Sequence, residues 1–370
     1  MFDGYKWDLQ AGEQSTISNQ IVILGEDTLH ELSDSAVSLY HETIEMEKAL
    51  KNNFDLVLEI GISEKMAKAL CDCTYNPNEH IRLMRFDFHP TTTGWQISEV
   101  NSDVPAGYPE SSILPRLAQK YFNNYIQCGD FGSTLANEIT KLVPAKSTIA
   151  YLHDTHTVED YQIMHFMGDL LEQQGFHSLY IDPSHIKWDE NAKALNVDAI
   201  IRYFPVEWLE YKKNMNWLNF INTKTPSCNH PIALLTQSKR LPLVWNQLGV
   251  DIPYWKKLLP KTANPLASSN QCQKQGWILK PAFGRVGEGI NIPNTLSKSE
   301  NQKIQKTAGE YPLQWVSQKM FDSVPIEGLH LNLGVFVING QFAGMYARAS
   351  KLPKIDSTAI EMPVLYERTV

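Results

Sequence analysis

Little in the sequence points to secretion, to membranes or to nucleic acid. The five cysteines are an odd number, with only Cys71 and Cys73 close together, so they provide neither a disulfide framework nor the usual zinc-knuckle spacing. The chain shows no basic and apolar leader and no apolar run of membrane-spanning length. Lysine and arginine number 33 against 41 acidic residues, and the net charge of −8 argues against a broad nucleic-acid surface. These absences predict a cytoplasmic protein that binds neither nucleic acid nor membrane.

What the sequence does contain is ordinary for a large globular protein. The 370 residues are 43% hydrophobic and 20% charged, which is sufficient for a sizeable core and for more than one packed subdomain. Residues 27–72 carry apolar side chains at helical spacing, and alternation of period two replaces that pattern from residue 81. Residues 109–125 again have a helical pattern. The first unit, residues 1–146, is therefore predicted to consist of helices and a hairpin.

Strands and helical patterns alternate in the middle of the chain. Residues 147–154 have the pattern of a short apolar strand, and an amphipathic helix that ends at Gly175 follows. Further strands are expected at 177–182 and 197–204. This order predicts a βαβ unit with a parallel sheet, and hence a Rossmann-like subdomain over residues 147–235.

The last unit, residues 236–370, is predicted to be rich in strands. A helix is expected over residues 238–249, and strands are expected at 277–281, 289–293, 314–321 and 330–350. Within the last of these ranges, Asn339-Gly340 lies between two alternating apolar runs, which is the sequence signal of a tight hairpin.

The stretch RFDFHPTTTGWQISEVNSD, residues 85–103, predicts an antiparallel hairpin of its own. A three-residue loop ending at Gly94, which tolerates positive φ, would put Asp87 opposite Glu99. The same register pairs Arg85 with Asn101. Because side chains alternate along a strand, these four polar residues share one face, and the phenylalanines at 86 and 88 point into a core.

Two carboxylates directly across a strand pair repel each other, so their placement needs a reason. A divalent cation between them supplies one, because Asp87, Glu99 and the amide oxygen of Asn101 are hard oxygen donors suited to Mg²⁺. Arg85 adds a positive group for an anionic part of a substrate. The alternative is a solvated face on which Asp87 pairs with Arg85 or a lysine. Repulsion in the pair also predicts that removing one carboxylate stabilises the hairpin.

A second motif, WILKPAFGRVGEGINIP at residues 277–293, resembles half of a nucleotide site. A strand delivers Lys280, and a loop containing Gly284 and Gly287 follows. Glycines let backbone N–H groups approach phosphate oxygens, and the lysine supplies a charge. The lysine precedes the glycines and no GK[ST] occurs, so this is not a Walker A loop. A plain β-hairpin is the alternative.

Two further features lie near the end of the chain. The backbone of the segment after residue 317 could hydrogen-bond an adenine edge, although an ordinary strand explains the pattern equally well; the segment comprises Gln318, Lys319, Met320 and Phe321. Arg348 interrupts the apolar run GMYARAS and needs an anionic partner. A transferring phosphate would serve, and an ion pair with Glu361 or Asp356 is the alternative.

These motifs together resemble the glutathionylspermidine synthase family of ATP-grasp carboxylate–amine ligases. The matching elements are, in order, Arg85-x-Asp87 with Glu99-x-Asn101, Lys239 before Leu-Pro-x-x-Trp, Lys280-Pro-x-x-Gly-Arg-x-Gly, and the late Arg348. Lys239 lies one residue nearer the Leu-Pro than the pattern has it. The likeness covers residues from about 80 to the end and only the synthetase part, without an amidase domain. It implies an α/β, circularly permuted ATP-grasp fold with a Rossmann-like pre-ATP-grasp subdomain.

The resemblance also implies the role of each matched residue. Asp87, Glu99 and Asn101 would hold Mg²⁺ between the phosphates of ATP. Nucleotide contacts would come from Lys239, Lys280, Gly284, Val286, Gly287, Gln318, Lys319, Met320, Phe321 and Asn332. Arg85 would orient the substrate carboxylate, and Arg348 would stabilise the phosphoryl group in flight.

The resemblance is weaker at the substrate positions. Val104 and Ala106 stand where the bifunctional enzymes have serines that touch glutathione, and only Asp356 or Glu361 offers an acidic group for a polyamine. The expected function is therefore an ATP- and Mg²⁺-dependent ligase that joins a small or peptide-like carboxylate to an amine, with both substrates open. The alternatives are an inactive nucleotide-binding regulatory or peptide-binding module, and a kinase-like phosphotransferase. The sequence does not indicate an oligomeric state.

Overall fold

The computed structural model of the protein describes residues 6–7, 10–11, 14–211, 216–265, 276–285, 287–293 and 295–368. Its helices are α1 Glu26–Lys51, α2 Phe54–Glu59, α3 Glu64–Asp72, α4 Ile113–Gln119, α5 Phe131–Leu142, α6 Val158–Glu172, α7 Trp217–Ile221, α8 Leu234–Gln237, α9 Pro253–Leu258 and α10 Lys298–Glu310. Over the residues described, no helix combines the length and the apolar character needed to cross a membrane.

Within the described ranges, the strands form five sheets. In chain order they are β1 Gln10–Ala11, β2 Gln14–Ser15, β3 Val22–Gly25, β4 Leu83–Thr91, β5 Gly94–Asn101, β6 Ile126–Gln127, β7 Thr148–His153, β8 His177–Ile181, β9 Ala199–Tyr203, β10 Ser227–Cys228, β11 Thr262–Ala263, β12 Trp277–Pro281, β13 Trp315–Lys319, β14 His330–Ile338, β15 Gln341–Ser350, β16 Ile360–Met362 and β17 Val364–Glu367.

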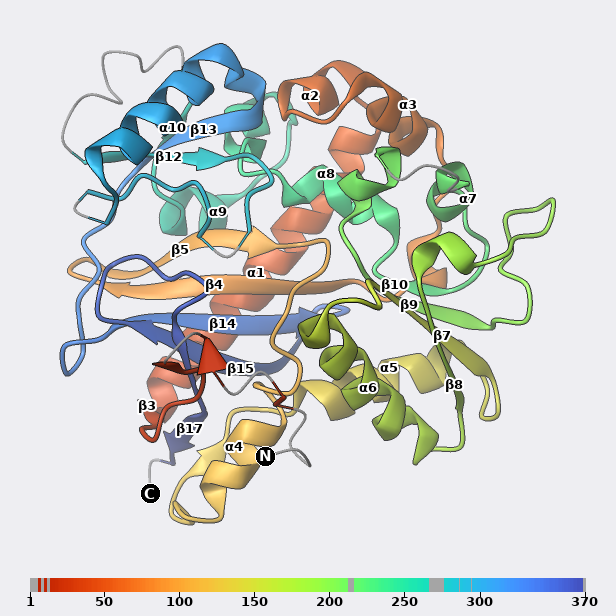
Figure 1. Cartoon of the computed structure of the whole chain (residues 1–370), viewed down its shortest axis with the longest axis horizontal. Coiled ribbons are helices and arrows are strands. Elements are labelled where there is room, and N and C mark those ends of the chain that lie inside the picture. The colour runs from red at the N-terminus through yellow and green to blue at the C-terminus, as the bar shows by residue number, and fades with distance from the viewer. Residues whose placement is uncertain are drawn as a thin grey trace.

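The central sheet is antiparallel and brings the early hairpin against the C-terminal strands. Its order is β16-β15-β14-β4-β5, and α1 runs diagonally across one face (Figure 1). The hairpin between β14 and β15 turns at Asn339 and Gly340, both with positive φ (48° and 81°), as the Asn-Gly signal predicts. This sheet contains strands of both the first and the third predicted unit, because β4 pairs with β14.

The early hairpin differs from its predicted register near the tip. Thr91 pairs with Gly94, so the loop has two residues rather than three, and Arg85 nevertheless pairs with Asn101 as predicted. A bulge between Phe86 and Phe88 reconciles the two registers, because it sets Ser98 and Glu99 together against Asp87. The extra residue in β5 therefore restores the register that the sequence predicted for the polar face.

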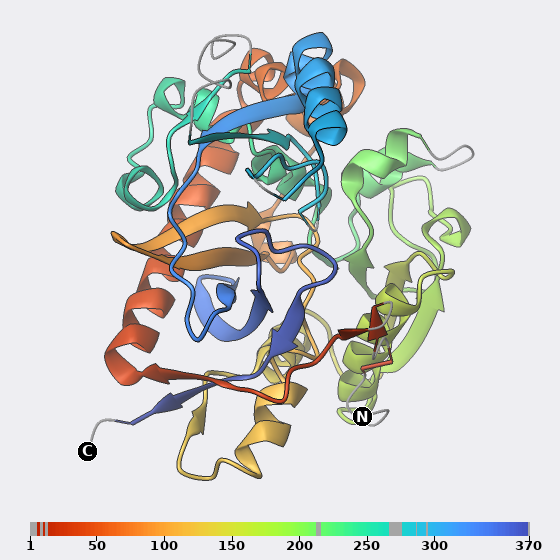
Figure 2. The same ribbon diagram turned by 60° about the vertical axis from the view of Figure 1, so that its left-hand side comes forward.

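The middle of the chain forms the parallel sheet expected of it. The order is β10-β9-β7-β8, and all three pairings are parallel. Helix α6 connects β7 to β8, and Gly175 at φ 87° follows the helix as predicted. Figure 2 shows this unit beside the rest of the molecule.

A small antiparallel sheet, β11-β13-β12, lies near α10 above the central sheet in Figure 1. Two sequence predictions are wrong here. Residues 289–293, expected as a strand, form no regular ladder after the glycine loop. Residues 238–249, expected as a helix, contain two short 3-10 turns, Leu241–Leu243 and Trp245–Gln247, because Pro242 interrupts the helical hydrogen bonds.

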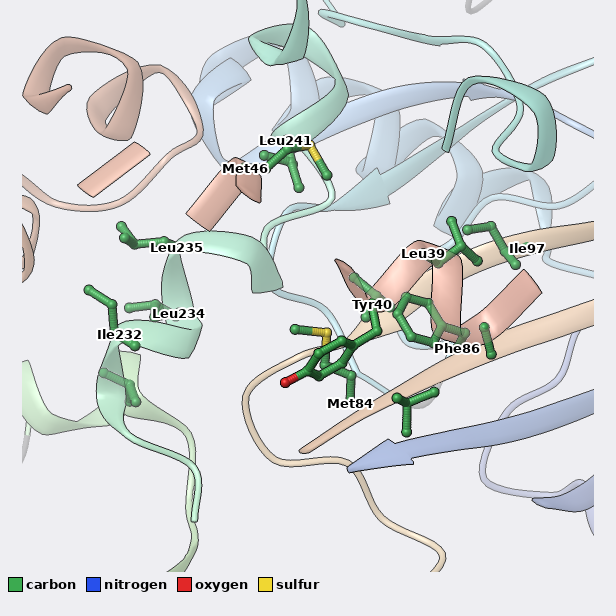
Figure 3. Packing of buried hydrophobic residues seen from close by; sticks show 14 of the residues in the cluster. Leu39, Tyr40, Met46, Met84, Phe86, Ile97, Ile232, Leu234, Leu235 and Leu241 are labelled. Carbon is green, nitrogen blue, oxygen red and sulfur yellow. The ribbon is translucent and has the colours of Figure 1, made fainter. Parts of the chain in front are cut away.

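Two apolar cores cover the two faces of the central sheet. The first lies between the sheet and α1 and includes Phe86 and Phe88, both fully buried as predicted (Figure 3). The second contains Phe131 of α5 and Phe336 of β14, and it continues into α6 and β7. The polar face of the early hairpin therefore lies on the same side of the sheet as the parallel unit.

A buried ion pair joins the parallel unit to the segment that follows β5. Arg202 of β9 contacts Asp103, and both are almost completely buried. Asp103 also accepts a hydrogen bond from the backbone N of Val206 at 3.0 Å. Arg202→Met leaves the Asp103 carboxylate buried without its cation, so we expect a loss of about 3–5 kcal/mol in the free energy of unfolding, measured by urea denaturation. The double variant Arg202→Met with Asp103→Leu is expected to recover part of that loss; no recovery would contradict the assignment.

Candidate functional site

Two cavities meet at the polar face of the early hairpin. The first, about 290 Å³, lies between the small sheet and the central sheet, and the second, about 340 Å³, lies toward the parallel unit. Glu99 and Arg348 line both. The first cavity brings together the predicted nucleotide residues Lys280, Gly287, Gln318, Lys319, Met320, Phe321 and Asn332. The second contains Arg85 and Asn101.

Asp87 lies at the centre of the polar face and is fully buried. Arg85 donates to both of its oxygens, with Nε 2.7 Å from Oδ1 and Nη2 3.0 Å from Oδ2. Asn101 Nδ2 is 3.3 Å from Oδ2. Burial alone would raise the pKa of Asp87, but the Arg85 guanidinium and its hydrogen bonds hold that pKa below the usual value. Asp87 is thus paired with Arg85, as the alternative interpretation has it, but in a buried setting rather than a solvated one.

Glu99 pairs with the predicted phosphate lysine. Lys239 Nζ is 2.8 Å from Glu99 Oε2 and 2.6 Å from the carbonyl oxygen of Gly284 in the glycine loop. Burial would raise the pKa of Glu99, but the Lys239 ammonium lowers it below its ordinary value. Both predicted metal carboxylates are therefore ionised at neutral pH, and each has a cation beside it.

The donor set fits Mg²⁺ rather than a transition metal. Two carboxylates and one amide provide oxygen ligands from adjacent strands, which is the donor chemistry that Mg²⁺ prefers. Across the described parts of the chain, no group of three or more His, Cys, Asp or Glu side chains could hold a metal ion. Asp87, Glu99 and Asn101 could therefore hold a magnesium ion that has further ligands from phosphate oxygens.

Lys280 of β12 is buried in the first cavity. Its Nζ is 2.6 Å from Gln318 Oε1 and 3.3 Å from the carbonyl oxygen of Ser98. Burial lowers the pKa of Lys280 to about 8, against the opposing effect of the Glu99 charge. An anion in the cavity would favour the protonated lysine.

The lowered pKa of Lys280 predicts a pH dependence of nucleotide binding. ATP affinity should fall as the pH rises through about 8, because the free protein then loses the ammonium charge. The folded state binds fewer protons than the unfolded state above that pH, so the contribution of Lys280 to stability rises in the same interval. Lys280→Arg, which stays charged, should show flat ATP affinity between pH 7 and 9 in calorimetric titrations. The same decline in both proteins would contradict the assignment.

The adenine segment forms one wall of the first cavity, but part of its backbone is already used. The amide of Lys319 donates to the carbonyl of Lys261 at 2.8 Å, and that of Met320 donates to the carbonyl of Gly276 at 2.8 Å. The Phe321 ring lies 5.0 Å from the ring of His89.

His89 is a cavity residue that the sequence reasoning missed. Its Nδ1 is 3.0 Å from the carbonyl oxygen of Leu331, its Nε2 is 3.0 Å from Ser98 Oγ, and Asn332 Nδ2 lies 3.4 Å from Nε2. Burial lowers the pKa of His89 to about 4, so the ring is neutral. Alternation along β4 could have found it, because His89 lies two residues beyond Asp87 and shares its face.

Arg348 connects the two cavities. It lies on β15, which pairs with β14 on one side and β16 on the other, so it is not an edge-strand residue. Its Nη2 is 3.5 Å from Asp87 Oδ2, and its side chain is 15% exposed. The guanidinium therefore points toward the predicted metal site rather than toward Glu361 or Asp356.

The glycine loop contributes Gly287 to the lining of the first cavity. Gly287 has φ 68°, and a Cβ there would lie 2.5 Å from the carbonyl oxygen of Ile355, so the position requires glycine. Gly284 contributes its carbonyl to Lys239. Val286, predicted to cover the phosphates, lies outside the described residues. The segment around Ile355, which the sequence reasoning did not single out, thus lies against the loop.

The second cavity combines both signs of charge. Its acidic members include Glu110, Asp160 and Glu361, and its cations include Lys6 and Arg285. Burial, Glu159 and Asp154 raise the pKa of Asp160 to about 7. The sequence singled out only Glu361 and, as the arginine of the glycine-loop motif, Arg285. The others come from distant parts of the chain and share no motif.

The chain is similar to a known protein family and to solved structures over nearly its whole length. Residues 2–365 match the family model described as glutathionylspermidine synthase preATP-grasp. The chain is similar to a glutathione synthetase-like effector from Globodera pallida, with 13% identity, 99% of this chain and 96% of that chain covered, and a TM-score of 0.64. It also matches a candidate gamma-glutamylcysteine synthetase from Methylobacillus flagellatus at 12% identity, with 93% of this chain and 90% of that chain covered and a TM-score of 0.47.

No curated protein matches the sequence significantly. The family model and the structural likeness confirm the circularly permuted ATP-grasp fold expected from the motifs. Members of the matched family are ATP-dependent carboxylate–amine ligases. Because the family model covers nearly the whole sequence, the chain belongs to the glutathionylspermidine synthase preATP-grasp family.

Proposed function

We propose that the protein is an ATP- and Mg²⁺-dependent ligase that joins a carboxylate to an amine through an acyl phosphate. One observation carries the proposal: two cavities share Glu99 and Arg348 at the polar face of the hairpin. The first has Lys280, Lys319 and Lys354 together with apolar walls, which suit a nucleotide. The second has Arg85 and several carboxylates, which suit an acid and an amine.

The chemistry follows from the charges at the junction. A carboxylate resists attack by an amine, so ATP first converts it to an acyl phosphate, and this transfer requires positioning and charge neutralisation. Asp87, Glu99 and Asn101 would hold Mg²⁺, which supplies charge neutralisation when bound. Lys239 and Lys280 would bind the phosphates. The amine then attacks the acyl carbon and inorganic phosphate leaves, without a covalent enzyme nucleophile.

To bind a substrate carboxylate, Arg85 must interact with a group other than Asp87, with which it is paired in the structure. Its Nη1 donates to the carbonyl of Ala106 at 2.7 Å and to the Tyr346 hydroxyl at 3.0 Å. A Cβ on Gly334 would lie 2.9 Å from Arg85 Cδ, so this glycine of β14 makes room for the side chain. If Mg²⁺ takes Asp87, Arg85 can turn its fork toward a substrate carboxylate in the second cavity.

Two residues of the second cavity bear on the identity of the acid substrate. Val104 and Ala106 both line the second cavity, and they offer no side-chain hydroxyl to a peptide such as glutathione. Their side chains present apolar surface to this cavity, and the Ala106 carbonyl already accepts a hydrogen bond from Arg85. The proposed acid substrate is therefore a peptide-like or amino-acid-like carboxylate other than glutathione.

Release of ADP in the presence of Mg²⁺ and a panel of acids and amines tests the proposal. ADP release that requires both an acid and an amine supports the ligase. Release that requires a single acceptor would replace the ligase with a phosphotransferase, and nucleotide binding without turnover would identify a regulatory or peptide-binding module.

A further inference from the structure

A primary amine of the chain itself lies in the second cavity. Lys6 lines this cavity, and its side chain is only 4% exposed. Its Nζ is 3.1 Å from Glu110 Oε1 and 2.7 Å from Glu361 Oε2. An ammonium group held by two carboxylates is thus present in the same cavity as Arg85 and Arg348.

Glu110 has acceptor capacity that the Lys6 side chain does not use. Glu110 is 3% exposed, and its second oxygen, Oε2, is buried without a hydrogen-bond partner among the described residues. A buried acceptor without a hydrogen-bond donor destabilises the folded state. The pair formed by Glu110 and Glu361 therefore fits a ligand with more N–H donors, or more positive charge, than the Lys6 side chain brings.

The described residues on either side of the cavity lining tie the segment that carries Lys6 to two other elements. The backbone N of Trp7 donates to Gln162 Oε1 of α6 at 2.8 Å, and the Trp7 ring lies 5.7 Å from the ring of Tyr161. Further on, Glu361 N donates to the carbonyl of Thr16 at 2.8 Å. Figure 2 shows the red N-terminal strands beside the unit that contains α6. Trp7 thus contacts α6, and Thr16 contacts β16, which carries Glu361.

We propose that this N-terminal segment is an internal competitor of the amine substrate, with the Lys6 ammonium occupying the position on Glu110 and Glu361 that an ammonium group of the incoming amine takes. The inference rests on the proposed function for the identity of the competing ligand. A structural ion pair would explain the two distances, but it would not explain why the pair lines the substrate cavity or why Glu110 retains an unused buried oxygen.

Calorimetric binding of 1,4-diaminobutane to the full chain tests the proposal without requiring turnover. Lys6→Ala removes the competitor, and we expect at least about tenfold tighter binding than in the unaltered protein, since removing a competitor raises the fraction of competent sites. Lys6→Arg keeps the charge and should bind as the unaltered protein does. Uncharged 1,4-butanediol should not bind. Glu110→Gln added to Lys6→Ala should remove the gain.

Equal affinity in the unaltered protein and in Lys6→Ala would overturn the proposal, as would tight binding that survives Glu110→Gln. Should Lys6→Ala fail to fold, hydrogen exchange in the unaltered protein decides the matter. Saturating diamine is expected to speed exchange at the Trp7 amide, and unchanged exchange would overturn the proposal. These readouts are independent of ADP release, so a failed ligase assay and a failed competitor test remain distinguishable.

Discussion

Asp87→Ala is expected to abolish ADP release, lowering turnover by about a thousandfold or more, because the predicted Mg²⁺ loses a carboxylate ligand at the site of phosphoryl transfer. The same change should lower the free energy of unfolding by about 3–5 kcal/mol, because the buried Arg85 guanidinium loses its bidentate partner. Thermal unfolding together with an ADP-release assay measures both effects.

The expected loss of stability reverses the sign predicted from sequence. Repulsion between facing carboxylates would make removal of one stabilising, but each carboxylate has a cation beside it in the structure. Glu99→Gln is the matched control, since its side chain is 20% exposed and its loss should cost less stability while turnover still disappears. Full stability with normal turnover in Asp87→Ala would refute both roles.

Arg348→Ala is expected to lower kcat by about a thousandfold, the scale on which an arginine stabilises a transferring phosphoryl group. Its effect on stability should be small, because the side chain is partly exposed and its contact with Asp87 is long at 3.5 Å. Arg348→Lys keeps the charge without the planar fork, so it should recover only part of the rate. Steady-state kinetics with saturating ATP separate these outcomes.

The control for Arg348 is Arg116→Ala. Arg116 forms an exposed ion pair with Asp130 at 2.7 Å, neither residue lines either cavity, and removal of Arg116 should leave kcat unchanged. If Arg348→Ala raises KM and leaves kcat unchanged, Arg348 binds substrate and takes no part in phosphoryl transfer.

Local patterns predicted the elements that depend on neighbours in sequence. The turn at Asn339-Gly340 and the parallel strands around α6 follow from signals within a few residues, and both were found. The helix expected at 238–249 failed because a proline interrupts it, and the strand expected at 289–293 failed because regular pairing with another strand is not a local property.

The candidate site likewise contains features that local sequence patterns predict and features that they do not. Alternation along β4 and β5 places Arg85, Asp87 and Asn101 on one face, and this could be foreseen. The bulge that aligns Glu99 with Asp87 could not, since it compensates for a two-residue turn that the sequence allows but does not require. His89 shares the same face, and the same alternation along β4 could have identified it.

By itself the sequence determined the identity and order of the charged groups, the alternation that puts them on one face, and the glycines that a close backbone approach demands. Only the tertiary structure decided their partners. Asp87 pairs with Arg85, and Glu99 pairs with Lys239. Lys6 forms ion pairs with Glu110 and Glu361, which are distant from it in sequence. The reason is physical: local periodicity fixes the direction of a side chain, whereas the partner of a buried charge depends on which distant groups folding brings within a few ångströms of it.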